Sequence, residues 1–205
     1  MKQVDDLSRE EKEELLKRID EDLKNTLSEK RYLHSVSSMK KAKELANEYN
    51  EDELTAMLTT LAHDIAKEMT DEEHRNYAKE NNIELDDFDM LQKTMLHGKV
   101  GADIVAKKYG FTKEMQDAIF YHTTGRANMT LLDKIVFLAD KSEEGRKEES
   151  ADELRRIIKE EGLDRAILWD IDYYSLPRFI EKEKLIHVES IYARNDIISK
   201  LHENI

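Results

Sequence analysis

Apolar residues recur at intervals of three and four along most of the chain. In residues 9–27 the repeat is carried by Leu15, Leu16, Ile19, Leu23 and Leu27. The same spacing continues in residues 29–49, 51–66, 90–108, 112–122, 130–141 and 163–202. This period is that of a helix with one buried face, and we find no alternation of the kind that marks a half-buried strand. The pattern predicts an all-α fold, a single helical bundle.

Short polar motifs predict where several helices begin. Ser8 with Glu11, and Thr70 with Glu73, have the spacing of a capping box, in which side chains satisfy the first free N–H groups of a helix. Single capping residues are expected at Asn50, Thr112 and Ser150.

Other residues predict interruptions of the helices. Residues around 85–87 are acidic and are expected to form a loop, and the 90–108 helix is expected to break near Gly98 and to end at Gly110. Pro177 is the only proline, and it predicts a kink or a boundary within residues 163–202. With 205 residues the chain suits one domain. We expect residues 1–28 to form an N-terminal helix packed on that domain, and residues 29–205 to form the domain with its C-terminal helices.

Composition limits the partners and the compartment. The net charge of −13 argues against a nucleic-acid partner, because such proteins neutralise phosphates with a basic face. No cysteine is present, so disulfides and thiolate ligands are excluded. No apolar run approaches the ~20 residues of a membrane helix, and the polar N-terminus lacks the apolar core of a signal peptide. We expect a cytoplasmic protein without a membrane partner, and an apolar face in the C-terminal half would allow a homodimer.

The adjacent residues His63 and Asp64 carry the strongest chemical signal. They follow Leu54, Leu58 and Leu61 in a segment that is predicted to be a largely buried helix. A buried carboxylate and imidazole are costly unless they are paired. A divalent transition metal would remove the cost, because imidazole nitrogen and carboxylate oxygen are both suitable ligands.

Four further residues extend this pair to a predicted ligand set. His34, His97, His122 and Asp140 each lie on, or at the end of, a different predicted helix. Helical proteins assemble metal sites from inward-facing side chains of this kind. A single histidine is more often an ordinary core or surface residue, and we exclude His74 as exposed, His187 as structural and His202 as terminal. The set suits Fe, Mn, Co or Zn, and the ligand types do not choose among them.

The motifs around these residues resemble those of the HD superfamily of metal-dependent phosphohydrolases. Within that superfamily the chain resembles the bacterial symmetrical diadenosine tetraphosphate hydrolases, the YqeK family. The resemblance rests on Arg31-Tyr32-Leu33-His34, Leu96-His97-Gly98-Lys99-Val100-Gly101-Ala102, Tyr121-His122-Thr123-Thr124-Gly125-Arg126, Leu138-Ala139-Asp140, Ile180-Glu181-Lys182, Leu185-Ile186-His187 and Ala193-Arg194-Asn195. Two positions depart from the family pattern, with Lys99 in place of a proline and Glu144-Gly145-Arg146 in place of Pro-Asn-Arg.

The resemblance implies a single HD-domain helical bundle with its metal site in the core, and iron as the metal. It also implies symmetrical cleavage of diadenosine tetraphosphate to two ADP through a metal-activated water. We assign His34, His63, Asp64 and Asp140 to a first ion. A second, weaker ion would be held by His97, His122 and the other oxygen of Asp64.

Two catalytic residues and four substrate-binding residues complete the prediction. Asp64 and Lys67 are the predicted catalytic residues, and the polyphosphate is expected to contact Lys67, Lys99, Arg126 and Arg146. Two alternatives remain open. The protein could be another HD phosphohydrolase, such as a nucleotidase, cyclic-nucleotide phosphodiesterase or alarmone hydrolase, or a non-catalytic regulator that binds metal or nucleotide.

Overall fold

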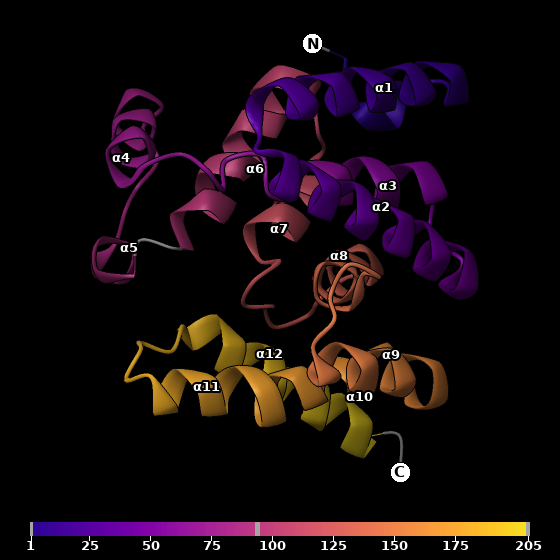
Figure 1. The fold of residues 1–205 in the computed structure, drawn as a ribbon, viewed down its shortest axis with the longest axis vertical. Helices are drawn as coiled ribbons and strands as arrows, with labels where there is room; N and C mark the ends of the chain where they lie inside the picture. The colour runs from indigo at the N-terminus through magenta and orange to yellow at the C-terminus, as the bar shows by residue number, and fades with distance from the viewer. Residues whose placement is uncertain (1, 93–94, 204–205) are drawn as a thin grey trace.

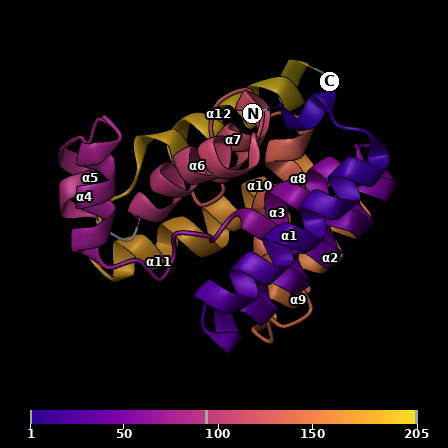
Figure 2. The same ribbon diagram turned by 90° about the horizontal axis from the view of Figure 1, so that it is seen from above.

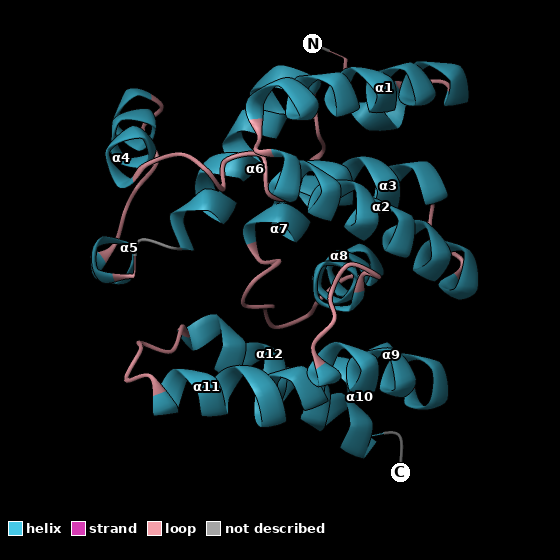
Figure 3. Cartoon of the chain, viewed as in Figure 1, coloured by secondary structure: helices cyan, strands magenta, loops and turns pink. Residues whose placement is uncertain are grey.

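The computed structural model describes residues 2–92 and 95–203, and in these residues it contains helices and loops but no strand (Figure 3). The all-α prediction is confirmed. The α-helices are α1 (Arg9–Thr26), α2 (Glu29–Tyr49), α3 (Glu53–Ala62), α4 (Asp71–Glu80), α5 (Asp87–Leu91), α6 (Leu96–Tyr109), α7 (Lys113–Phe120), α8 (Leu131–Ser142), α9 (Glu149–Glu161), α10 (Leu163–Trp169), α11 (Leu176–Glu181) and α12 (Val188–Glu203). A 3-10 helix covers Val4–Asp6, and a π-helical segment, Asp170–Ser175, joins α10 to α11.

The helices form two layers with α8 between them. Helices α1–α3, α6 and α7 lie above α8 in Figure 1, and α9–α12 lie below it. In α8 the residues Ile135, Val136, Phe137, Leu138 and Ala139 are consecutive and all buried. A helix that is apolar on every side is covered on every side, and this explains the central place of α8. From above, α4 and α5 extend to one end of the molecule (Figure 2).

Helix α1 joins the same core. Its capping box is present as predicted, with the Ser8 hydroxyl bound to the Glu11 N–H and the Glu11 carboxylate bound to the Ser8 N–H. Leu15, Ile19 and Leu23 are buried in the cluster that also contains residues of α3 and α8. No helix of the described residues is both long enough and apolar enough to span a bilayer.

Two predicted helix caps were wrong. Asn50 does not begin α3; it ends α2 in the left-handed conformation, with φ 62°, and Asp52 caps α3 through Thr55 N–H. Asparagine is common both at the start and at the end of helices. Here Asp52 caps the start of α3, so Asn50 ends α2. Helix α9 begins at Glu149 after an N-cap residue, Glu148, whose side chain makes no capping bond, so Ser150 lies inside the helix.

Two predicted boundaries were also wrong. The region predicted as one helix over 90–108 holds the end of α5 and all of α6, and part of the predicted segment, residues 93–94, lies outside the described residues. Gly98 lies within α6 and does not break it. The boundary predicted at Pro177 is confirmed, because the π-helical segment ends at Ser175 and α11 begins at Leu176. Pro177 lies in the first turn of α11, where its missing N–H costs nothing. The chain reverses at residues 182–187, after α11.

Candidate metal centre

His63 and Asp64 lie where α3 ends. Helix α3 stops at Ala62, and His63 is its C-cap residue, so the pair is not inside the helix as predicted. In the residues after α3, backbone N–H groups donate to the carbonyl oxygen three residues earlier. Lys67 N–H, for example, donates to Asp64 O at 2.9 Å. These tight turns keep both side chains buried while the chain leaves the helix.

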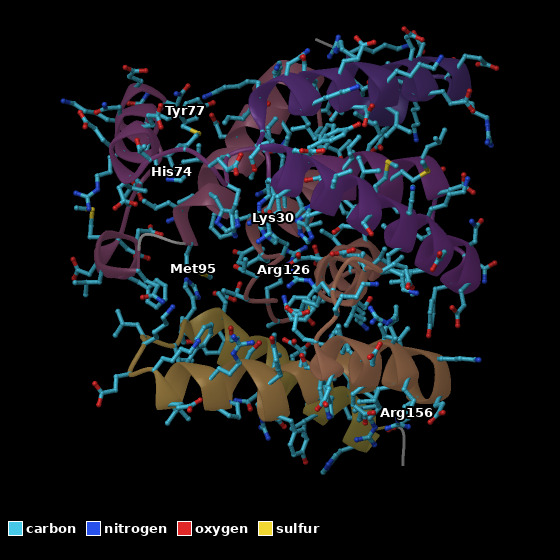
Figure 4. The ribbon with its side chains drawn as sticks, in the orientation of Figure 1. Lys30, His74, Tyr77, Met95, Arg126 and Arg156 are labelled. Carbon is cyan, nitrogen blue, oxygen red and sulfur yellow. The ribbon has the colours of Figure 1, made fainter. Side chains whose placement is uncertain are left out.

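The turn that follows the pair is held by α4. His74 is buried, and its Nε2 lies 2.8 Å from the carbonyl oxygen of Ala66. The prediction that His74 is exposed was therefore wrong. Helix α4 is polar along most of its length, but His74 and Tyr77 extend from it toward α6 (Figure 4), where the Tyr77 hydroxyl donates to Asp103. Sequence polarity did not reveal this inward face.

The structure brings the six predicted ligands together around the carboxylate of Asp64. Its Oδ2 lies 3.9 Å from Nε2 of His34 and 3.6 Å from Nε2 of His63. Asp140 Oδ1 is 3.0 Å from the His34 Nε2 and 3.7 Å from the His63 Nε2. These four residues are the set assigned to the first ion.

The other oxygen of Asp64 faces the remaining two histidines. Its Oδ1 lies 3.3 Å from Nε2 of His97 and 3.6 Å from Nε2 of His122, and the two Nε2 atoms are 3.1 Å apart. Asp64 thus offers one oxygen to each group of ligands. The assignment of ions to these groups stays a prediction.

The imidazoles are oriented by bonds on their outer nitrogens. Nδ1 of His63 lies 2.6 Å from the Thr60 carbonyl oxygen, and Nδ1 of His122 lies 2.6 Å from that of Ile119. When Nδ1 carries the proton for such a bond, Nε2 has a free lone pair. In both rings that lone pair faces the centre.

The unsatisfied atoms of the centre fit a divalent cation. The buried atoms without a hydrogen-bond partner include Nε2 of His34, Nε2 of His63 and Oδ1 of Asp64. Buried polar atoms are normally paired. The two Nε2 atoms belong to the first group of ligands and Oδ1 of Asp64 faces the second, so each group contains an atom that a cation would satisfy. Ligand atoms bound at ~2.1 Å to one ion lie about 3–3.4 Å apart. The separations given above for the centre run from 3.0 to 3.9 Å, so a bound ion would draw several of these atoms slightly closer.

Metal binding needs ionised carboxylates and neutral imidazoles. The two carboxylates meet this condition, whereas Asp64 and Asp140 raise the pKa of His63 against the effect of burial. Burial alone would raise the pKa of Asp64, but the charge of His63 and the facing imidazole nitrogens of His122 and His97 hold that pKa well below its usual range. The pKa of Asp140 is likewise held low, against burial, by His34 and His63. Burial lowers the pKa of His122 to about 4.

A cleft of about 560 Å³ opens onto this centre. Its wall includes the ligands His34, Asp64 and Asp140, and its basic side chains are Lys30, Arg31, Lys67 and Arg146. Figure 4 shows Lys30 at mid-height, between the two layers, whereas Arg156 lies at the outer edge of the lower layer. The same cleft is also lined by four carboxylates, those of Asp64, Asp140, Glu143 and Glu148.

Two of the four predicted substrate-binding residues, Lys67 and Arg146, line the cleft, as does the predicted catalytic residue Asp64. Lys67 Nζ lies 2.9 Å from Nε2 of His97 and 3.6 Å from Oδ1 of Asp64. Arg146 donates to the Asp140 carboxylate at 2.9 Å and to its backbone carbonyl oxygen at 2.6 Å. Both side chains therefore contact a predicted metal ligand and also line the cleft.

The other two predicted residues lie elsewhere. Neither Lys99 nor Arg126 is among the described residues that line the cleft. The Arg126 guanidinium is paired with Asp133 at 2.8 Å and with Asp117 at 3.4 Å. Lys99 is paired with Asp89, in a separate pocket of about 180 Å³.

Two residues of the site were missed. Arg31 donates to Oδ2 of Asp64 at 2.7 Å, and Glu143 lies 3.2 Å from Nδ1 of His34. Arg31 precedes His34 by three residues, a spacing that places both on one helix face, so the sequence contained a signal for it. Glu143 had none, because it follows α8 in a charge-rich segment.

Comparison with known proteins identifies relatives of this chain. The family model described as HD domain matches residues 31–145. A symmetrical bis(5'-nucleosyl)-tetraphosphatase of Bacillus subtilis is 35% identical over 150 residues, which are 73% of this chain and 80% of that protein. The enzyme of the same name from Halalkalibacterium halodurans is 32% identical over 177 residues, 86% of this chain and 93% of its own.

A solved structure has the same fold. It is a crystal structure from Clostridium acetobutylicum, described as a predicted HD superfamily hydrolase involved in NAD metabolism. It superposes with a TM-score of 0.85 at 38% identity, and the match covers 90% of this chain and 97% of that one.

Proposed function

The chain belongs to the HD-domain family and, within it, to the family of the symmetrical bis(5'-nucleosyl)-tetraphosphatases, and from this premise we propose that it hydrolyses diadenosine tetraphosphate to two ADP. The observation that carries the proposal is the Asp64 carboxylate, which lies between two groups of histidines beside a cleft that contains four basic side chains. A nucleotide polyphosphate is the substrate class that suits this combination of cations and metal ligands.

The proposed metal ligands are His34, His63, Asp64 and Asp140 for one ion, and His97 and His122 with Asp64 for another. Iron is the proposed metal, on the basis of the sequence resemblance. Bound metal would lower the pKa of a water molecule toward neutrality and withdraw charge from phosphoryl oxygens.

The side chains of the cleft would orient the substrate. Arg31 and Arg146 already contact the carboxylates of the centre, and their remaining N–H groups can bind phosphate oxygens. Lys67 is close enough to Asp64 to orient its carboxylate and to reach a phosphate in the cleft. We leave Lys99 and Arg126 out of this contact set, because carboxylates outside the cleft already pair with them.

A product assay tests the function. Incubation with diadenosine tetraphosphate and a divalent metal should give ADP alone. Formation of ATP with AMP would show asymmetric cleavage, and absence of turnover would reject the proposal. A panel of mononucleotides, cyclic nucleotides and guanosine alarmones at equal concentration separates the other phosphohydrolase activities. Loss of turnover in Asp64→Ala would exclude a contaminating hydrolase.

A further inference from the structure

His34 differs from His63 and His122 in what holds its ring. His63 and His122 lie at helix ends, and each Nδ1 is bound to the carbonyl oxygen three residues earlier. His34 lies inside α2, where backbone carbonyls are already bonded within the helix. Its Nδ1 contacts a side chain 109 residues away, the carboxylate of Glu143, at 3.2 Å. Its orientation therefore depends on a distant part of the chain.

The Glu143 carboxylate is itself fixed. The residue is only 3% exposed, although it follows α8 in a loop. Its Oε2 accepts a hydrogen bond from the Gly145 N–H, while Oε1 faces His34. A Cβ at Gly145 would lie 2.7 Å from Oε2 and 3.0 Å from Oε1. The glycine therefore leaves the room that the carboxylate occupies.

The loop that carries Glu143 is fastened by α9. Arg155 donates to the carbonyl oxygens of Ser142 and Glu143 at 3.0 Å each, and to that of Arg146 at 3.2 Å. One arginine of the lower layer thus binds three backbone carbonyl oxygens within residues 142–146. The same loop contacts His34 in the upper layer through Glu143.

We propose that Glu143 is a positioning residue for His34. It accepts the Nδ1 proton, so that the Nε2 lone pair of His34 faces the ion, and Arg155 and Gly145 hold the carboxylate in place for this. Such outer partners fix the tautomer and the ring orientation of a ligating histidine. Glu143 acts only through His34. Its loss therefore weakens metal binding and affects the reaction only through the metal. The inference rests on the proposed metal site.

Metal affinity gives the first test. The affinity of the purified, metal-stripped protein for Zn²⁺ is measured by competition with a chromogenic chelator. Glu143→Gln should weaken the tightest Zn²⁺ site by about 10–100-fold, the usual cost of losing such a partner. Glu144→Gln is the matched control, because Glu144 is the exposed neighbour and the charge change is the same; it should bind as the wild type does.

A second variant displaces the carboxylate without removing its charge. Gly145→Ala places a methyl group against Glu143, at a position where φ is not in the left-handed region. Zn²⁺ affinity should fall in this variant too. If Glu143→Gln does not fold, as judged by circular dichroism, Gly145→Ala decides the question.

The tautomer provides a readout that a purely structural role would not move. In the Zn²⁺-loaded protein with ¹⁵N-labelled histidine, the Nδ1–H resonance that disappears in His34→Gln belongs to His34. It should be slow to exchange in the wild type and in Glu144→Gln. It should shift or exchange with water in Glu143→Gln and Gly145→Ala. Unchanged Zn²⁺ affinity and an unchanged resonance in these two variants would overturn the role of Glu143. Failure of the wild type to bind Zn²⁺ would overturn the metal site itself, and this inference with it.

Discussion

Asp64 is buried among groups that favour its charged form. Arg31 donates to Oδ2 at 2.7 Å, and Lys67 Nζ is 3.6 Å from Oδ1. These two cations line the cleft together with His34, whereas His63, His97 and His122 are buried and are not among the described residues that line it. A buried carboxylate with partners on both sides keeps its charge, and that charge is what a bridging metal ligand requires.

Replacing Asp64 by Asn tests this role with little change in shape. An amide has one oxygen acceptor, so it cannot offer an oxygen to both groups of histidines. We expect metal content to fall and turnover of diadenosine tetraphosphate to drop by at least about 100-fold, since loss of even an outer partner costs 10–100-fold. Elemental analysis and the product assay measure the two effects. Asp87→Asn, at an exposed position in α5, is the control. Full metal content in Asp64→Asn would contradict the assignment.

Asp170 predicts a pH dependence of stability. It is buried in the π-helical segment, with one hydrogen bond from Ser175 at 2.9 Å, and burial raises the pKa of its carboxyl group. The folded protein therefore binds this proton more tightly than the unfolded chain does. Its charged form opposes folding at neutral pH, and the penalty disappears as pH falls through the folded-state pKa toward the unfolded value of ~3.9.

Asp170→Asn should therefore unfold at a higher temperature than the wild type at pH 8. The difference should shrink steadily as the pH is lowered toward 4, where the wild-type carboxyl group is also neutral in the folded state. Thermal unfolding measured at several pH values by differential scanning calorimetry gives the curve. A variant that is less stable than the wild type at pH 8 would show that the charge of Asp170 contributes favourably.

At the scale of helices, the sequence predicted those features that depend on neighbouring residues. The capping boxes at Ser8 and Thr70 formed because both partners are within four residues. The predicted helix break at Gly98 was wrong, because the reason for this glycine is a contact with another helix. A Cβ at Gly98 would lie 2.8 Å from the carbonyl oxygen of Phe120, at the contact between α6 and α7. The glycine permits a close approach of two helices, and periodicity within one helix does not reveal this.

Gly98→Ala should separate α6 from α7. The methyl group meets a backbone atom, which cannot rotate away as a side chain can, and such overpacking costs about 1–3 kcal/mol. Alanine recovers ~1 kcal/mol of helix propensity, so we expect a net loss of up to about 2 kcal/mol in unfolding free energy. His97 and His122, whose Nε2 atoms are 3.1 Å apart, lie on these two segments. These two histidines would hold the second, weaker Zn²⁺ ion. The variant should therefore bind that ion less tightly than the wild type does.

Gly101→Ala is the matched control in the same helix. Its Cβ would lie 3.4 Å from a methyl group of Ile65, an ordinary contact with a side chain. This variant should be as stable as the wild type, or slightly more so, and should bind Zn²⁺ equally. Chemical denaturation and chelator competition compare the two variants. Equal behaviour of Gly98→Ala and Gly101→Ala would show that the contact between α6 and α7 does not control the centre.

At the scale of the molecule, sequence reasoning predicted the side chains that meet around Asp64 but not the residues that support them. His63 and Asp64 were identifiable because they interrupt an apolar segment, and His34, His97, His122 and Asp140 because their local motifs are characteristic. Glu143 is one of 46 acidic residues. Its role arises only when the loop after α8 meets α2, so it depends on long-range packing. Likewise, Arg126 lies in a characteristic motif, yet its position relative to Asp117 and Asp133 is set by the packing of α7 against α8.

The charge of the whole molecule opposes the binding of an anion, and bound metal would offset it. The net charge is −13, so the long-range field repels a polyphosphate. The side chains of the cleft do not overcome this repulsion by themselves. Its four basic residues, Lys30, Arg31, Lys67 and Arg146, face four carboxylates, those of Asp64, Asp140, Glu143 and Glu148. With neutral histidines the lining has no excess of positive charge, and divalent ions would supply it.

ADP binding should therefore depend on the metal. A unit charge pair at 4 Å contributes about 4 kcal/mol at an effective dielectric constant of ~20, and each ~1.4 kcal/mol is tenfold in affinity. Removing the metal should weaken ADP binding by well over tenfold, measured by isothermal titration calorimetry in buffer without Mg²⁺. Adding Zn²⁺ or Mn²⁺ should restore it. Adenosine, which carries no phosphate, is the control, and its affinity should not change. Equal ADP affinity with and without metal would mean that the side chains alone overcome the repulsion, and the metal would then have no part in holding the phosphates.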